Sequence, residues 1–224
     1  AFVFALARGF HRAWNIRVEN RMDRQSFDTY FEQIQDVFGQ SCLIVGLGEI
    51  GEKLGNACAS IGMKVSGVKK NTTKVPVWLD KVYSIGELNQ AVQNVDYVIN
   101  LLPLFPQTRN VFDAQIFNNM KKSAFFINLG RGDTVNEPQL AEALKNDTIA
   151  GAGLDVFSSA SYVSPTVPLT SDSPFWNLEN VILTPHVAGI TTKYWEKECE
   201  LFMQNLRNFI NGTRLLNEVD IDIC

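Results

Sequence analysis

The part of this sequence best suited to chemistry is a glycine-spaced turn, Gly46-Leu-Gly48-Glu-Ile-Gly51. It follows an apolar run at 42–45 and opens a segment of helical periodicity. In a dinucleotide-binding turn the first glycine permits a tight bend, the second lets the backbone approach the pyrophosphate, and the third allows close helix–strand packing. The turn therefore predicts dinucleotide binding, and an ordinary glycine-rich turn is the alternative.

Two cations, Lys69 and Lys70, follow the next apolar run. A site for NAD has an Asp or Glu about 20 residues past the first glycine, where it accepts from the ribose hydroxyls. A pair of lysines suits a 2′-phosphate instead and leaves the NAD ribose without its acceptor, so the sequence favours NADP over NAD. Lys74 could assist. The alternative is that these lysines are solvated loop charges.

The elements that must position these residues alternate between two kinds. Short apolar runs typical of strands are separated by segments of helical periodicity, and a Ser-, Thr- and Pro-rich stretch at 157–175 predicts a long loop. This alternation predicts an α/β fold, a doubly wound parallel sheet of Rossmann type with helices on both faces. The expected strands are 42–45, 64–68, 97–101, 124–128, 151–154 and 181–183, and the expected helices are about 50–61, 86–93, 113–120, 137–145 and 191–211.

Composition excludes several classes of function. The chain has 224 residues and a net charge of −4, which gives no electrostatic footprint for nucleic acid or an anionic membrane. The apolar residues 1–7 are too short to span a bilayer, and they run into a leading amphipathic helix in which His11 is expected to be structural. The four cysteines form no paired motif, so neither disulfides nor a metal site is expected, and a cytoplasmic location fits.

Four further stretches occur in order behind the glycine turn. They are Leu101-Leu-Pro-Leu-Phe-Pro-Gln-Thr-Arg109, Ile127-Asn-Leu-Gly-Arg-Gly132, Ile149-Ala-Gly-Ala-Gly-Leu-Asp-Val-Phe157 and Val181-Ile-Leu-Thr-Pro-His-Val-Ala-Gly189. Together with the turn they resemble the D-2-hydroxyacid dehydrogenase family, which includes glyoxylate/hydroxypyruvate reductases and phosphoglycerate dehydrogenase. The resemblance extends over nearly all of 41–218 and implies hydride transfer between NADPH and a small 2-keto or 2-hydroxy acid.

The resemblance also implies catalytic roles. Arg131 would hold the substrate carboxylate through a bidentate, charge-assisted contact. His186 would protonate or deprotonate the reacting oxygen while hydride passes to or from the nicotinamide. The alternatives are a surface cation for Arg131 and a satisfied core histidine for His186.

The remaining implied positions bind the cofactor. Backbone groups of the glycine turn would meet the pyrophosphate, two later loops would line the adenosine and nicotinamide ribose, and two further residues would lie near the nicotinamide. In that order these are Glu49 and Ile50; Leu102, Pro103, Leu129 and Gly130; then Asp155, which would hold the carboxamide, and Gly189.

Two departures from the family pattern bear on activity. The family's third catalytic group is a Glu that orients the histidine, and here an ungapped alignment places Ala160 at that position, whereas alignment from Pro174 places Val167 there. No Asp or Glu lies between Val156 and Ser171, so weak or absent turnover is expected.

The second departure is length. The resemblance divides the chain into a leading helix and connection at 1–40, a dinucleotide-binding domain at 41–190 and a C-terminal helix and tail at 191–224. The family's substrate domain, of roughly a hundred residues, is expected ahead of the leading helix. The chain is therefore expected to be a fragment or to lack that domain. The alternative function is a catalytically impaired dinucleotide-binding scaffold or regulatory module, and pairing as a homodimer follows only from the resemblance.

Overall fold

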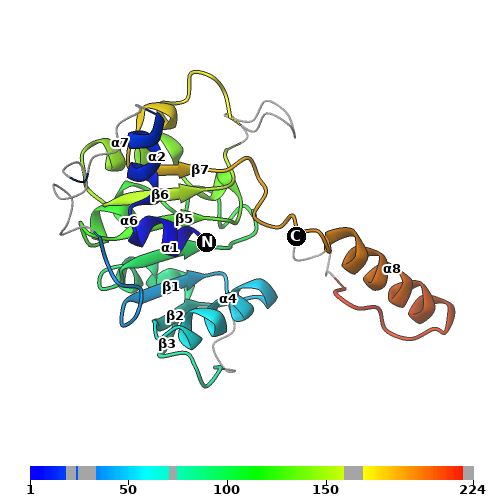
Figure 1. Ribbon diagram of the computed structural model, residues 1–224. Coiled ribbons are helices and arrows are strands. Elements are labelled where there is room, and N and C mark those ends of the chain that lie inside the picture. Colours follow the sequence, from blue (N-terminus) through cyan, green and yellow to red (C-terminus); the bar gives the residue numbers. More distant parts are fainter. Residues whose placement is uncertain (19–23, 25–33, 71–74, 159–168, 219–224) are drawn as a thin grey trace. The chain divides into compact units, whose positions relative to one another are not determined.

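One parallel sheet organises the first part of the chain. The computed structural model describes residues 1–18, 24, 34–70, 75–158 and 169–218. Seven strands lie side by side in the order β3-β2-β1-β4-β5-β6-β7 (Figure 1). Every neighbouring pair is parallel, which confirms the predicted doubly wound fold. The strands are β1 Ser41–Val45, β2 Lys64–Val68, β3 Lys81–Tyr83, β4 Tyr97–Asn100, β5 Phe125–Asn128, β6 Gly151–Leu154 and β7 Val181–Leu183.

The strand order reverses beside β1. The chain moves outward from β1 to β2 and β3, then returns to add β4 on the other side. In open parallel sheets the ligand crevice lies outside the carboxyl ends of the strands at such a switch point. The fold therefore directs attention to the loops that follow β1 and β4.

Helices cover both faces of the sheet, as the alternation predicted. Alternate strand side chains point to opposite faces, so Ile44 and Ile99 join one buried cluster whereas Leu43 and Val98 join the other. On the first face pack α1 (Phe2–Ala7) and α4 (Glu49–Ser60). On the second face pack α5 (Leu88–Ala91), α6 (Ala114–Asn119) and α7 (Glu137–Lys145).

Side-chain caps fix where two of these helices begin. Asn136 accepts a hydrogen bond from the backbone N–H of Gln139 at the start of α7, and Pro138 occupies the first turn, as the sequence predicted. Asp113 accepts in the same way from Ile116 at the start of α6.

The leading segment differs from the single helix expected. It forms α1 and a second helix, α2 (Phe10–Val18), separated at Gly9, whose φ of 64° lies in the left-handed region. A left-handed residue interrupts helical hydrogen bonding, and glycine adopts it without steric cost. His11 is buried in α2, as expected of a structural residue.

The chain divides into two compact units, Ala1–Pro185 and His186–Cys224, which are described separately. The second unit contains α8 (Tyr194–Ile210), a helix on which no residue is buried. Its exposed large hydrophobic side chains are those of Tyr194, Trp195, Phe202, Met203, Leu206, Phe209 and Ile210. Across the described ranges, no helix has the length and apolar character needed to cross a membrane.

Candidate dinucleotide site

The glycine turn between β1 and α4 has the geometry that its spacing predicted. Gly46 has a φ of 105°, and a Cβ there would lie 2.9 Å from the carbonyl carbon of Leu101 after β4. A Cβ on Gly51 would lie 2.4 Å from the main-chain oxygen of Gly46. Neither position can therefore carry a side chain without moving backbone, so the first and third glycines are required by packing.

The middle glycine faces open space. A Cβ on Gly48 would meet no described atom within 4 Å. The backbone here, with a φ of −90° and a ψ of −160°, can also be adopted by any residue, so neither packing nor conformation requires glycine. Gly48 is the N-cap of α4 and offers no side chain to the free N–H groups of the first turn. An exposed helix start with these groups free is suited to phosphate, so the turn fits a dinucleotide pyrophosphate. Glu49 and Ile50, whose backbone was assigned to the pyrophosphate, are exposed here.

Lys69 lies directly beside this turn. The Val68 oxygen accepts hydrogen bonds from the N–H groups of Gly46 and Leu47, each at 3.1 Å, which ties the turn to the end of β2. The Lys69 ammonium lies 2.7 Å from Oε1 of Glu52 in the first turn of α4. Lys70 is exposed to solvent. Lys74 lies outside the described residues.

Two loops that follow β4 and β5 lie against each other. A Cβ on Gly130 would lie 2.7 Å from the Leu102 oxygen, so these backbones are in close contact. Leu102 and Leu129 are half-buried and Pro103 is exposed. The structure thus places the expected lining residues at the carboxyl ends of neighbouring strands.

A buried polar network holds these two loops, and the sequence reasoning missed it. Asn100 ends β4 and Asn128 ends β5, and the Asn100 amide donates to Oδ1 of Asn128 at 2.9 Å and to Oγ1 of Thr134 at 2.7 Å. The Asn128 oxygen also accepts from the Gly130 N–H at 3.2 Å, and Thr134 donates to the Arg131 oxygen at 2.6 Å. An Asn closing each of two apolar runs was the available signal, because buried polar groups need partners.

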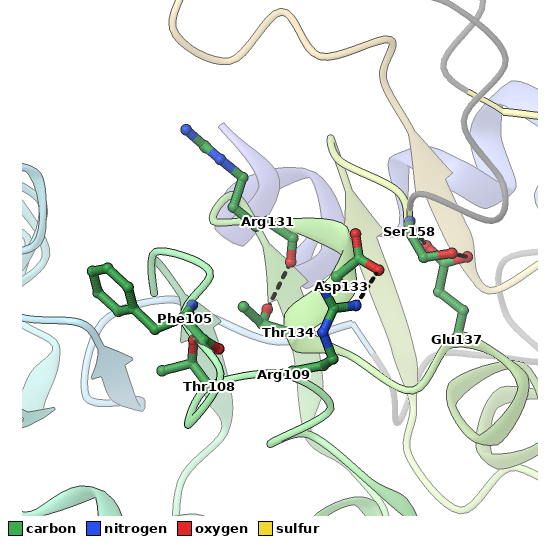
Figure 2. Close-up of polar contacts among 8 residues, drawn as sticks. All are labelled: Phe105, Thr108, Arg109, Arg131, Asp133, Thr134, Glu137 and Ser158. Carbon is green, nitrogen blue, oxygen red and sulfur yellow. Dashed lines mark hydrogen bonds and ion pairs between the residues drawn. The ribbon is translucent and has the colours of Figure 1, made fainter. Parts of the chain in front are cut away.

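This network fixes the main chain of Arg131 and leaves its guanidinium exposed. Figure 2 shows the Arg131 side chain pointing away from a neighbouring ion pair, in which Arg109 contacts Asp133 at 2.9 Å. The Arg131 guanidinium donates to the Gly130 oxygen at 2.9 Å. The backbone at 110–112 also bonds to Asp133 and Thr134, so the loop after β4 braces the turn that carries Arg131. An exposed cation on a braced turn suits binding of a small carboxylate.

Asp155 and Glu137 are buried acids near the end of β6. Asp155 is 2% exposed, and its carboxylate accepts a hydrogen bond from the Thr184 hydroxyl at 2.5 Å. Glu137 accepts from the hydroxyl of Ser158 at 2.9 Å and also from the Ser158 N–H (Figure 2). Glu137 therefore anchors the start of the long loop. Ala160 and Val167, the two candidates for the missing acid's position, lie outside the described residues.

His186 and Gly189 belong to the second unit, and both are exposed. His186 has a φ of 56°, a left-handed conformation uncommon for a residue with a side chain. A strained conformation of this kind persists only where the surrounding structure holds it, and such conformations cluster at functional sites.

Comparison with known proteins decides the family. The model described as "D-isomer specific 2-hydroxyacid dehydrogenase, NAD binding domain" matches residues 1–188. The chain belongs to this family. The resemblance inferred from the sequence is therefore confirmed.

Several D-isomer specific 2-hydroxyacid dehydrogenases match most of this chain. Glyoxylate/hydroxypyruvate reductase B of Enterobacter sp. (strain 638) is 35% identical over 180 residues, which are 79% of this chain and 52% of that protein. A probable 2-hydroxyacid dehydrogenase from Rhizobium etli, solved with NADP, HEPES and L(+)-tartaric acid, is 25% identical with a TM-score of 0.79, covering 96% of this chain and 64% of that one. A family protein from Xanthobacter autotrophicus, solved with NADPH and MES, is 27% identical with a TM-score of 0.73, covering 97% and 88%. The chain spans about half the length of the curated relatives that it matches.

Proposed function

We propose that this chain binds NADP(H) at the Gly46–Gly51 turn. We further propose that the whole protein transfers hydride between NADPH and a small 2-keto or 2-hydroxy acid. The observation that carries the proposal is the open space at Gly48 at the start of α4, between two glycines that packing requires. The lysine beside the turn and the NADP and NADPH bound to two related structures favour NADP, although the family description names NAD.

The catalytic roles follow from the family motifs. A bound nicotinamide supplies or accepts the hydride. Arg131 binds the substrate carboxylate, which its exposed guanidinium and braced main chain support. His186 exchanges a proton with the reacting oxygen.

The cofactor residues are proposed to act in four groups. The turn residues Gly46, Gly48, Glu49, Ile50 and Gly51 hold the pyrophosphate, and Lys69 and Lys70 hold the 2′-phosphate. Leu102, Pro103, Leu129 and Gly130 line the adenosine and ribose, and Asp155 and Gly189 lie near the nicotinamide.

A second function, that of a dinucleotide-responsive scaffold, is favoured by one observation. The stretch from Phe157 to Thr170 contains no Asp or Glu to orient His186. Such a module would bind the dinucleotide and turn over little or no substrate.

One set of measurements tests the first function and separates the two. NADPH and NADH are titrated against the chain by nicotinamide fluorescence, and turnover of glyoxylate and hydroxypyruvate is measured with the whole protein. We expect tighter binding of NADPH than of NADH. Binding without turnover supports the scaffold, and a Val167→Glu variant that gains activity assigns the missing acid. Failure to bind either nucleotide contradicts both functions.

The finer assignments on location and assembly are also proposals. The described cysteines Cys42, Cys58 and Cys199 are free, which supports a reducing compartment such as the cytoplasm. A homodimer is proposed from the family resemblance alone, and light scattering after size-exclusion chromatography measures it directly.

A further inference from the structure

The ammonium assigned to the 2′-phosphate already has an acidic partner. Lys69 Nζ lies 2.7 Å from Oε1 of Glu52, and the two side chains are 26% and 43% exposed. The backbone holds both ends in place, since the Lys69 N–H donates to the Tyr83 oxygen at 3.0 Å and Glu52 lies within α4. The ion pair therefore spans from the end of β2 to the first turn of the phosphate-binding helix.

We propose that Glu52 is a specificity-determining residue that weakens NADPH binding relative to NADH by competing for Lys69. The inference rests on the proposed function, because it concerns the same dinucleotide site. A 2′-phosphate carries negative charge into the space beside Lys69, where the Glu52 carboxylate repels it. Either the Glu52 carboxylate moves away from the Lys69 ammonium, or the carboxylate and the phosphate both accept from its three N–H donors and repel each other at short range. NADH carries no 2′-phosphate and leaves the pair intact.

The effect is modest because the pair is partly exposed. Solvent screens the pair, and ion pairs of this exposure contribute little in water. We expect removal of the Glu52 charge to improve the preference for NADPH over NADH about two- to fivefold, which is about 0.4–1 kcal/mol. Removal of the Glu52 charge would instead lower the preference for NADPH if the main role of Glu52 were to hold Lys69 in the orientation that binds phosphate.

The chain supplies a matched control. Glu49 also lies in the first turn of α4 and is paired with a lysine, since Lys53 Nζ lies 2.6 Å from its Oε1. Glu49→Gln and Glu52→Gln each remove one carboxylate near the same helix start. Both changes alter repulsion of the pyrophosphate, which is common to NADPH and NADH, but only Glu52 contacts Lys69.

The experiment measures the dissociation constants of NADPH and NADH at one fixed salt concentration. The proteins are the wild-type chain, Glu49→Gln, Glu52→Gln, Lys69→Met and the Glu52→Gln/Lys69→Met double variant. We expect the ratio of the NADH to the NADPH constant to rise about two- to fivefold in Glu52→Gln and to stay within error in Glu49→Gln. The double variant should differ from Lys69→Met by less than Glu52→Gln differs from the wild type, because Glu52 can no longer compete for Lys69 and only its direct repulsion of the 2′-phosphate is removed.

The outcomes distinguish failure of the Glu52 role from failure of the proposed dinucleotide binding. Binding of neither nucleotide by the wild type overturns the proposed function and the inference with it. Wild-type binding with an unchanged or lowered ratio in Glu52→Gln overturns the role of Glu52 alone. An equal rise in Glu49→Gln also overturns it, because the effect would then belong to the general charge of the helix start.

Discussion

The buried amide of Asn128 offers the sharpest stability prediction. Replacing it by Leu keeps a similar volume but removes the oxygen that accepts from Asn100 at 2.9 Å and from the Gly130 N–H at 3.2 Å. Asn128 is 2% exposed, so water cannot readily replace either bond. Each of the two orphaned donors costs about 1–3 kcal/mol, which gives a total loss of about 2–6 kcal/mol in the free energy of unfolding. The 3.4 Å contact from its amide to the Arg131 oxygen adds little, since Thr134 still donates to that oxygen.

Urea unfolding followed by tryptophan fluorescence measures this loss. The matched control is Asn119→Leu, which removes one half-buried bond, from the Asn119 amide to Asn89 at 2.8 Å. The control should lose about 0.5–1 kcal/mol. The reasoning is refuted if Asn128→Leu loses no more stability than the control, because the buried network would then contribute no more than a single half-buried bond.

Two further predictions concern buried polar groups without a hydrogen-bond partner among the described residues. The Tyr97 hydroxyl is buried in this way beside Phe125, so Tyr97→Phe should keep the ring contact and raise the free energy of unfolding by about 1 kcal/mol or more, and a loss would mean that the hydroxyl has a partner. Burial, with a smaller contribution from Arg12, lowers the pKa of His11 to about 4. The unfolded chain therefore binds the extra proton first as pH falls, and stability should drop by about 3 kcal/mol between pH 7 and pH 4. A His11→Leu variant should lack that component, whereas identical pH profiles of unfolding would contradict the assignment.

Much of the fold could be predicted because alternating apolar runs and helical segments leave few other topologies. The strand β3, Lys81–Tyr83, was not predicted, since it has three residues, none of them buried, at the sheet edge. This strand is formed by its pairing with β2, which the local residue pattern does not reveal. The helix expected at 86–93 became a 3-10 turn, Ile85–Glu87, followed by the short α5, because a capping box at Ser84 starts the turn earlier.

The site was predictable where a motif constrains the backbone and less so where side chains meet across strands. The glycine turn follows from local geometry, and the packing of Gly46 and Gly51 agrees with it. The pairing of Lys69 with Glu52 joins residues 17 apart on different elements, so it depends on how α4 lies against β2. The Asn100–Asn128 bond likewise depends on the register of β4 and β5, in which these two residues are partners.

The central claim is that the space at Gly48 receives the dinucleotide pyrophosphate, and one substitution tests it most directly. A Cβ at this position meets no described atom within 4 Å, and valine tolerates the extended backbone but is a poorer N-cap than glycine, so Gly48→Val should lower the free energy of unfolding by about 1 kcal/mol. Its side chain would fill the space in front of the helix start. NADPH titration by nicotinamide fluorescence should then show at least about a tenfold loss of affinity relative to the wild type. A folded Gly48→Val chain that binds NADPH as tightly as the wild type would contradict the claim.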